Sequence, residues 1–272
     1  MLERDTQRGF RIVGSRVIEL DPDVSPQTIA INDAGQVAGI ATRERVFPEG
    51  TRPRGTPPDM KFYDEVGFLT PPNQPLDLAR DEIGHYGERR NAWAGLSLHV
   101  IRISSVNALG QVVGSASARS FRTAPNRPID PATDDLGTLG GPQSSANAIN
   151  NQGDVVGGSE TADARNRAFL FTNGHMIDLN QCVNLEPGWI LVRADDINNR
   201  GQIIAAAVDS RDIRARSLRA YLLSPAPEPG ALVMLILATT VTGSGIALRF
   251  GRSFRAWFRF KLPVASCRFP VD

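Results

Sequence analysis

Cysteine is scarce in this 272-residue chain, which contains only Cys182 and Cys267, far apart in the sequence. Disulfide scaffolds and cysteine zinc sites both need several cysteines at short, regular spacings. The sequence therefore argues against both disulfide cross-links and a cysteine zinc site. We interpret Cys182 as a small buried hydrophobic residue.

A surplus of charge of one sign is also missing. Lys and Arg number 30 and Asp and Glu number 29, which leaves a net charge of +1. Without a basic surplus there is no general field that would attract a phosphate backbone, so we expect no nucleic-acid partner. Residues 1–13 carry charges but are followed by no apolar run, so they lack the pattern of a secretory signal.

Groups with metal or catalytic spacing are absent from the sequence. The three histidines, His85, His99 and His175, stand apart, with no second ligand at a metal-binding interval. The carboxylate pairs 134–135 and 195–196 could suggest acid–base chemistry, but both precede repeat strands, which favours turn or surface positions. We therefore expect no cofactor, no metal and no catalytic residue, and we predict that the protein is not an enzyme.

Glycine and proline, in contrast, are plentiful. The chain has 25 glycines and 19 prolines, and 41% of its residues are hydrophobic. This composition suits many short strands joined by turns around a real core. It predicts an all-β fold.

One nine-residue pattern occurs four times and organises the first part of the chain. It consists of an aliphatic residue, Asn, two variable residues, Gly, Gln or Asp, two mostly aliphatic residues, and Gly or Ala. The copies are INDAGQVAG at 31–39, VNALGQVVG at 106–114, INNQGDVVG at 149–157 and INNRGQIIA at 197–205. The last two intervals fit a four-stranded propeller blade of about 40 to 50 residues.

The first interval is longer, which predicts surface insertions in the first blade. Two stretches can hold the excess. Residues 46–60 contain four prolines, which a central strand does not tolerate. Residues 79–100 are charged and lack the repeat pattern.

The repeated Asn and Gly have backbone reasons to be there. An Asn at the first position of a turn can bond its own backbone two residues on. The Gly three residues later is where a type I turn with a G1 bulge needs positive φ. Each turn offers at most one or two carboxylates, far fewer than a calcium loop needs. The predicted structural turn residues are Asn32, Gly35, Asn107, Gly110, Asn150, Gly153, Asn198 and Gly201.

A further strand, turn and strand follow each copy, so that a full unit has about four short strands. The third unit shows this in residues 167–178, whereas the fourth unit ends after 219–223. We expect residues 10–20 to supply the missing strands of the fourth unit, closing a ring of about four blades; a five-bladed or an open arrangement is the alternative.

Residues 135–180 resemble the HAF-repeat family of extracellular proteins. The match runs from Asp-Leu-Gly-Thr-Leu-Gly-Gly through Ala-Ile-Asn and Gly-x-Val-Val-Gly to an Ala-Phe-Leu strand, and the resemblance covers roughly residues 10–224. Arg167 and Arg219 stand where the family has His. The resemblance implies an extracytoplasmic β-propeller-like domain, taken here as 1–224, with no known catalytic residues.

The tail, 225–272, has a different composition. Residues 231–248 form an 18-residue stretch without a charge. As a helix it would be roughly 27 Å long, close to the hydrocarbon thickness of about 30 Å. The basic residues Arg249, Arg252 and Arg255 follow it and favour a cytoplasmic C-terminal side. We predict a transmembrane helix with the repeat domain outside; a buried core helix is the alternative.

The order of features in the tail resembles the PEP-CTERM sorting signal of bacterial surface proteins. Pro227, Glu228 and Pro229 precede the apolar span, and the arginine cluster follows it. The resemblance implies recognition by an exosortase-type membrane protease and release to the cell surface. This tail departs from the pattern because about twenty residues continue to Asp272, and because no N-terminal signal pattern accompanies it.

These observations lead to a functional expectation. We expect a non-catalytic surface or extracellular-matrix protein, exported and membrane-anchored, that binds a polysaccharide or a surface protein. The alternative is a propeller-type polysaccharide hydrolase or lyase, which would need polar residues from several blades to converge. A decayed gene product without a role is a third interpretation, based on the absent signal pattern.

Overall fold

The computed structural model describes the ranges 10–13, 16–19, 27–44, 63–84, 89–91, 96–98, 101–212, 217–225 and 264–267. Strands dominate this part of the chain. The only helices within it are the four-residue α1 (Leu78–Asp81) and the three-residue 3-10 helix η1 (Leu179–Gln181). The predicted all-β fold is confirmed.

Four sheets of three or four strands follow one another along the chain. Sheet 1 contains β3 (Gln27–Ile31), β4 (Val37–Glu44), β5 (Tyr63–Leu69) and β6 (Glu82–Gly84), and sheet 2 contains β9 (Ile101–Val106), β10 (Val112–Ala116) and β11 (Arg119–Arg122). Sheet 3 contains β12 (Gly140–Ile149), β13 (Val155–Thr161), β14 (Asn166–Thr172) and β15 (His175–Asp178). Sheet 4 contains β16 (Trp189–Ile197), β17 (Ile203–Asp209), β18 (Leu218–Pro225) and β19 (Val264–Cys267). Two ribbons stand apart from these sheets: β1 (Phe10–Val13) pairs with β2 (Arg16–Glu19), and β7 (Arg89–Asn91) pairs with β8 (Leu96–Leu98).

Each repeat of the sequence builds one sheet. The repeated turn joins the first strand of a sheet to the second, and the aromatic segment that follows forms the third strand. Sheet 2 has three strands because its expected fourth is reduced to a single bridge between Phe121 and Asp135. The expected unit of about four strands therefore holds for sheets 1 and 3, whereas the repeat supplies three strands of sheet 4 and β19 adds the fourth from the C-terminal end.

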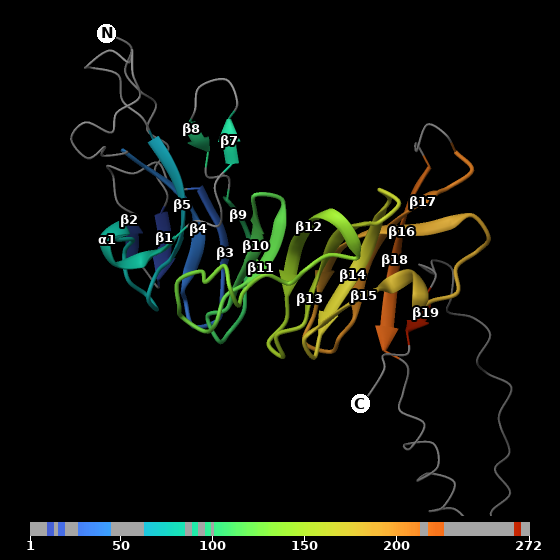
Figure 1. Ribbon diagram of the computed structural model, residues 1–272. Helices are drawn as coiled ribbons and strands as arrows, with labels where there is room; N and C mark the ends of the chain where they lie inside the picture. Colours follow the sequence, from blue (N-terminus) through green and yellow to red (C-terminus); the bar gives the residue numbers. More distant parts are fainter. Residues whose placement is uncertain are drawn as a thin grey trace, which may run out of the picture.

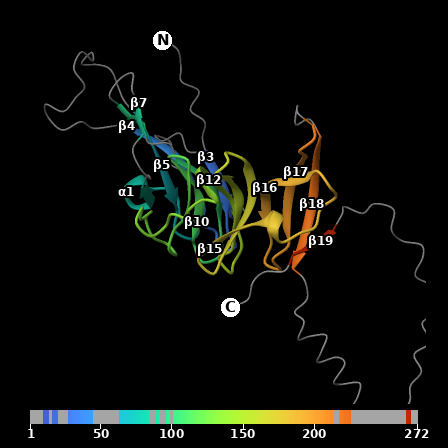
Figure 2. The same cartoon turned by 45° about the vertical axis from the view of Figure 1, so that its right-hand side comes forward.

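The four sheets stand face to face in a row (Figure 1). The first strand of each sheet packs against the preceding one: β9 against sheet 1, β12 against sheet 2 and β16 against sheet 3. Sheets 1 and 4 lie at opposite ends of the row in both views (Figures 1 and 2). The described strands therefore form an open array, which is the alternative to the predicted ring, and no closed propeller is found among them.

The hydrophobic core is divided among the sheet interfaces. Because successive side chains of a strand point to opposite faces, Val155 of β13 packs toward sheet 2 while Val156 packs toward sheet 4. In sheets 2, 3 and 4 the aromatic residue of the third strand fills the interface with the preceding sheet, whereas in sheet 1 it packs with Val37, Val66 and Leu76. These equivalent residues are Phe68, Phe121, Phe169 and Tyr221, and all are buried.

The edge of sheet 4 explains why residues 10–20 do not complete it. The outer edge of β18 is occupied by β19, which runs parallel to it with Leu222 opposite Val264. Strands β1 and β2 pair with each other instead. The expectation that the N-terminal segment completes the fourth blade is therefore wrong, because a strand from the C-terminal end holds that position.

The expected insertions of the first blade have different outcomes. Residues 46–60 lie outside the described residues. The stretch 79–100 is only partly an insertion, because it contributes β6, which pairs with β5 as the fourth strand of sheet 1. The ribbon β7–β8 is the part that adds to the blade.

The predicted features of the tail lie outside the described residues. This applies to the span 231–248, to the motif at 227–229 and to the arginines at 249, 252 and 255. Within the ranges described, no helix is both long enough and apolar enough to cross a membrane.

Candidate functional site

The repeated turn has the local geometry that its sequence predicts. In the third copy, Asn150 Oδ1 accepts hydrogen bonds from the backbone N–H of Gln152 (3.0 Å) and Asp154 (2.9 Å), and the N–H of Gly153 donates to the Asn150 carbonyl (3.1 Å). The turn glycines all have positive φ, between 71° and 89°, as the bulge requires. They are Gly35, Gly110, Gly153 and Gly201.

The Gln or Asp of the motif also has a role, which sequence reasoning missed. The side-chain amide of Asn107 donates to Oε1 of Gln111 (2.8 Å), and the amide of Asn150 donates to a carboxylate oxygen of Asp154 (2.9 Å). A side-chain acceptor four residues after the Asn therefore fixes the amide orientation. The occurrence of Gln or Asp at this position in all four copies of the motif was the sequence signal that could have revealed this role.

The four turns are also bonded to one another, in what we call the turn ladder. Asn32 Nδ2 donates to the carbonyl of Asn107 (2.8 Å), and Asn107 Nδ2 donates to the carbonyl of Asn150 (3.0 Å). The residues after the second and third Asn continue the connection: the N–H of Ala108 donates to Oδ1 of Asn151 (3.0 Å), and the N–H of Asn151 donates to Oδ1 of Asn199 (2.8 Å). The predicted turn residues are thus brought together along one side of the array.

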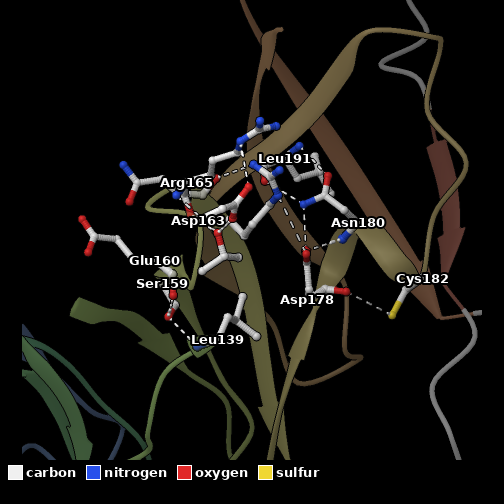
Figure 3. Close-up of polar contacts among 12 residues, drawn as sticks. Leu139, Ser159, Glu160, Asp163, Arg165, Asp178, Asn180, Cys182 and Leu191 are labelled. Atoms are coloured by element: carbon white, nitrogen blue, oxygen red, sulfur yellow. Dashed lines mark hydrogen bonds and ion pairs between the residues drawn. The ribbon is translucent and has the colours of Figure 1, made fainter. Parts of the chain in front are cut away.

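The junction of sheets 3 and 4 is also held by a cluster of polar contacts, the polar clasp, formed by Asp178, Asn180 and Leu191 (Figure 3). Asn180 bonds both backbone groups of Leu191, with its amide donating to the carbonyl (2.9 Å) and its oxygen accepting from the N–H (2.8 Å). Asp178 caps η1 by accepting from the N–H of Asn180 (2.9 Å). Cys182, which the sequence predicts to be buried, is only partly buried and packs against the edge of this core.

A polar groove crosses sheets 2, 3 and 4 and is the candidate functional site. It is a cavity of about 550 Å³ between β9, β10, β12, β13, β14 and β16. Its hydrogen-bonding and charged lining residues are Arg102, Ser115, Gln143, Ser144, Ser145, Asn147, Ser159, Glu160, Asn166 and Arg193. No aromatic residue lines it, and its side chains come from three repeats.

Some of these polar residues build the groove wall. Ser144 Oγ lies 2.8 Å from the hydroxyl of Ser120 and donates to a backbone carbonyl. Ser159 Oγ accepts from the N–H of Leu139 (2.9 Å, Figure 3). Asn147 Nδ2 donates to the carbonyl of Ala194 (2.7 Å), which ties sheet 3 to sheet 4. These groups are committed to the fold.

Other side chains remain available for a ligand. Arg102, Gln143 and Asn166 are exposed, and Glu160 is half-buried. Within the part of the chain that the structure describes, none of these four side chains forms a hydrogen bond or ion pair. Arg193 is paired with Asp195. The groove therefore offers neutral amides together with one basic and one acidic group.

Two charged groups close to the groove, Arg122 and Asp134, are partly and fully buried respectively. The Arg122 guanidinium donates to the carbonyl of Gly153 (2.6 Å) and lies 5.3 Å from the centre of the Phe171 ring. Burial lowers its pKa from the ordinary value, although nearby Asp154 opposes that change. Burial likewise raises the pKa of the Asp134 carboxyl, which accepts from the N–H of Asp130 (2.7 Å).

The remaining sequence candidates do not converge on the groove. In the first carboxylate pair, Asp134 is buried and Asp135 is ion-paired with Arg119 (2.9 Å). In the second pair, Asp195 binds Arg193 and Asp196 accepts from the N–H of Ile197. Among the described residues there is no group of three metal-ligating side chains, and His175 lies exposed at the start of β15.

A second cavity of about 470 Å³ lies beside the turns of sheets 1 and 2. Several of its polar side chains are bonded to one another. Arg80 is paired with Asp81, and Gln36 Nε2 donates to Oδ1 of Asn126 (2.8 Å). The polar groove therefore offers more unused recognition groups.

Comparisons with known protein families, with curated proteins and with solved structures gave no match.

Proposed function

We propose that this protein is a non-catalytic surface or extracellular-matrix protein that binds a polysaccharide in its polar groove and is exported and anchored through its tail. The chemistry of the groove carries the proposal. Its available groups are Gln143, Asn166, Arg102 and Glu160, which hydrogen-bond to hydroxyl and carboxylate groups.

The groove favours a sugar polymer over a protein partner. Protein interfaces are anchored by buried apolar and aromatic side chains in their centres. The non-polar residues of the groove are small or few: Ala118, Gly158 and Val192. A ligand rich in hydroxyl groups can use the amides, and it does not need an apolar anchor.

The same composition supports binding rather than cleavage. Most glycosidases use two carboxyl groups about 5 to 10 Å apart. Glu160 is the one carboxylate among the groove-lining residues. The hydrolase or lyase alternative would therefore require a second acid from elsewhere.

Binding can be tested by titrating the protein with neutral and acidic polysaccharides in a calorimeter. Gln143→Ala and Asn166→Ala should each weaken binding about tenfold, a loss of about 1.4 kcal/mol. Both side chains are exposed and unbonded within the described structure, so stability should not change. Gln181→Ala changes an exposed amide outside the groove and is the matched control.

Three outcomes would overturn this assignment. Unchanged affinity in both groove variants would place the ligand elsewhere. A protein ligand that competes for the groove would replace the sugar class. Release of reducing ends from the polysaccharide would revive the catalytic alternative.

The tail supports the second half of the proposal. The 18 uncharged residues at 231–248 and the following arginines have the pattern of an anchor, and Pro227, Glu228 and Pro229 have the pattern of a sorting motif for an exosortase-type protease. If the span crosses a membrane, its two ends lie on opposite sides. Since β18 precedes it and β19 follows it, insertion requires β19 to separate from β18.

The anchor can be tested with the full chain expressed behind a signal peptide. We expect it to partition with membranes, whereas a chain ending at Pro225 should be soluble. In a Cys182→Ser background, a membrane-impermeant thiol reagent added outside should not label Cys267. Labelling would show that β19 stays on the same side as β18 and that the span does not cross.

The same system separates sorting from anchoring. Glu228→Ala should block processing in a host with the cognate protease but leave insertion intact, because residue 228 precedes the span. Normal processing of this variant would remove the sorting assignment alone.

A further inference from the structure

Large hydrophobic side chains are exposed mainly at the two ends of the array. The described residues of this kind are Ile29, Ile31, Leu109, Ile204 and Leu218. Ile29 and Ile31 lie on β3, the first strand of the row, and Ile204 and Leu218 lie on the last sheet. Between the ends, only Leu109 at the tip of a turn is comparably exposed within the described part of the chain.

At the C-terminal end, the outer face of sheet 4 has the residues of an interface, but no other described sheet packs against it. In sheet 3 the corresponding face carries Val156 opposite Leu170, and β16 of the next sheet covers both. In sheet 4 the equivalent pair is Ile204 opposite Leu222. Ile204 is 47% exposed, whereas Val156 is fully buried.

At the N-terminal end, the complementary half of that interface is exposed. The aliphatic residue before the turn Asn packs into the preceding sheet at Val106, Ile149 and Ile197, which are 6–7% exposed. The equivalent Ile31 has no preceding sheet of the row among the described residues and is 60% exposed. Phe68 at this end is already buried, so β3 is the part of the end that remains open.

The turn ladder is also incomplete at both ends. At two of the three junctions within the array, the N–H of the residue after the turn Asn donates to a side-chain oxygen of the next repeat: Ala108 to Asn151 and Asn151 to Asn199. At the last turn the N–H of Asn199 has no such acceptor among the described residues. At the first turn the Asp33 carboxylate, in the position of the acceptor, is exposed and receives no hydrogen bond from the described residues.

We propose that a second copy of this chain docks head to tail on the array, with β3 of one copy against the outer face of sheet 4 of the other. This contact continues an interface that the chain already forms three times. Ile31 would fill the site between Ile204 and Leu222, and Asn199 N–H would donate to the partner copy's Asp33. Two copies would contain eight sheets, and known propellers have about four to eight blades.

The contact is weaker than the internal ones. Asp196 stands at the inner margin of the face, at the position that Ala148 occupies in sheet 3. Its carboxylate accepts from the N–H of Ile197 (2.8 Å) and is exposed. Burying part of its hydration shell costs free energy, so the association should depend on protein concentration.

Disulfide trapping tests the proposal in the full chain, extracted in mild detergent and carrying Cys182→Ser and Cys267→Ser. Asp33→Cys and Asn199→Cys are made in separate chains, mixed and oxidised. A linked pair of chains should appear in the mixture and not in either variant alone. The pair Ala108→Cys with Asn151→Cys, which is the same ladder contact within one chain, shows whether this spacing accepts a disulfide.

The other outcomes overturn the proposal. Linked pairs from Asn199→Cys alone would show a two-fold contact of sheet 4 with itself. A disulfide within one chain carrying both substitutions would show closure of a single-chain ring. No linked pair, when the Ala108–Asn151 control forms, would show that the ends do not meet.

A mass measurement provides an independent check. Ile31→Asp and Ile204→Asp should each weaken self-association at least tenfold in sedimentation equilibrium without unfolding the chain, because both side chains are exposed. Leu109→Asp, at a position of similar exposure away from both ends, should leave the association unchanged. Equal behaviour of all three variants would contradict the assigned faces.

Discussion

Replacing Phe169 with alanine is expected to lower the free energy of unfolding by about 3–5 kcal/mol. Phe169 is fully buried on β14, where it packs between sheets 2 and 3 with Val113, Ala146 and Val155. Its neighbours belong to two different sheets whose strands are tied by backbone hydrogen bonds, so they cannot collapse to fill the space. The expected loss of stability therefore has two parts: the free energy that burial of the ring contributes, and the cost of the cavity that its removal leaves.

Chemical denaturation measured by circular dichroism is the appropriate assay. Leu109→Ala is the control, because Leu109 is 53% exposed and should change stability by only about 0.5 kcal/mol. A loss below about 1 kcal/mol for Phe169→Ala would mean that the two sheets are not packed as described. If the Phe169→Ala variant unfolds in two separate transitions, one for each half of the chain, the interface between sheets 2 and 3 is what couples the unfolding of neighbouring repeats.

Gly157→Ala is expected to cost about 3 kcal/mol, although it adds one methyl group. A Cβ at this position would lie 2.0 Å from the carbonyl oxygen of Ser145 and 2.9 Å from a ring carbon of Phe169. The obstacle is backbone of the paired strand β12, so relief requires the two strands to move apart. Gly114 of sheet 2 has the same close approach, with the Arg102 carbonyl at 1.8 Å.

The adjacent Gly158 provides a matched control for this prediction. A Cβ there would meet only the Val192 carbonyl oxygen at 3.5 Å and an Arg193 side-chain carbon at 3.8 Å, which are ordinary contacts. Gly158→Ala should therefore change the melting temperature little. Equal melting temperatures for the two variants would contradict the strand approach at Gly157.

The last residue of the repeat pattern illustrates how far the sequence could be interpreted. It is Gly in three copies and Ala205 in the fourth. The pattern indicates that a small residue is needed, but the reason, a close approach of the first strand at a β-bulge, is visible only in the paired strands. The Asn and Gly of the turn were predictable because their bonds are local. The bonds between turns join residues 43 to 75 positions apart and depend on how the sheets stack.

The polar groove could not be predicted in the same way. Gln143, Glu160 and Asn166 belong to three strands of sheet 3, and Arg102 comes from sheet 2. None of them stands in a motif with catalytic or metal spacing. The sequence drew attention instead to the carboxylate pairs at 134–135 and 195–196, whose members are bonded to arginines or backbone groups nearby.

The sequence by itself determined the all-β class, the four repeats and the geometry of their turns, because alternating apolar residues and an Asn-x-x-Gly turn act over a few positions. Only the tertiary structure decided that the array is open. Strand pairing at an edge depends on which distant segment reaches it, and β19 holds the edge of β18 that residues 10–20 were expected to fill. A repeat pattern specifies how neighbouring units pack, but it does not specify what meets the two ends.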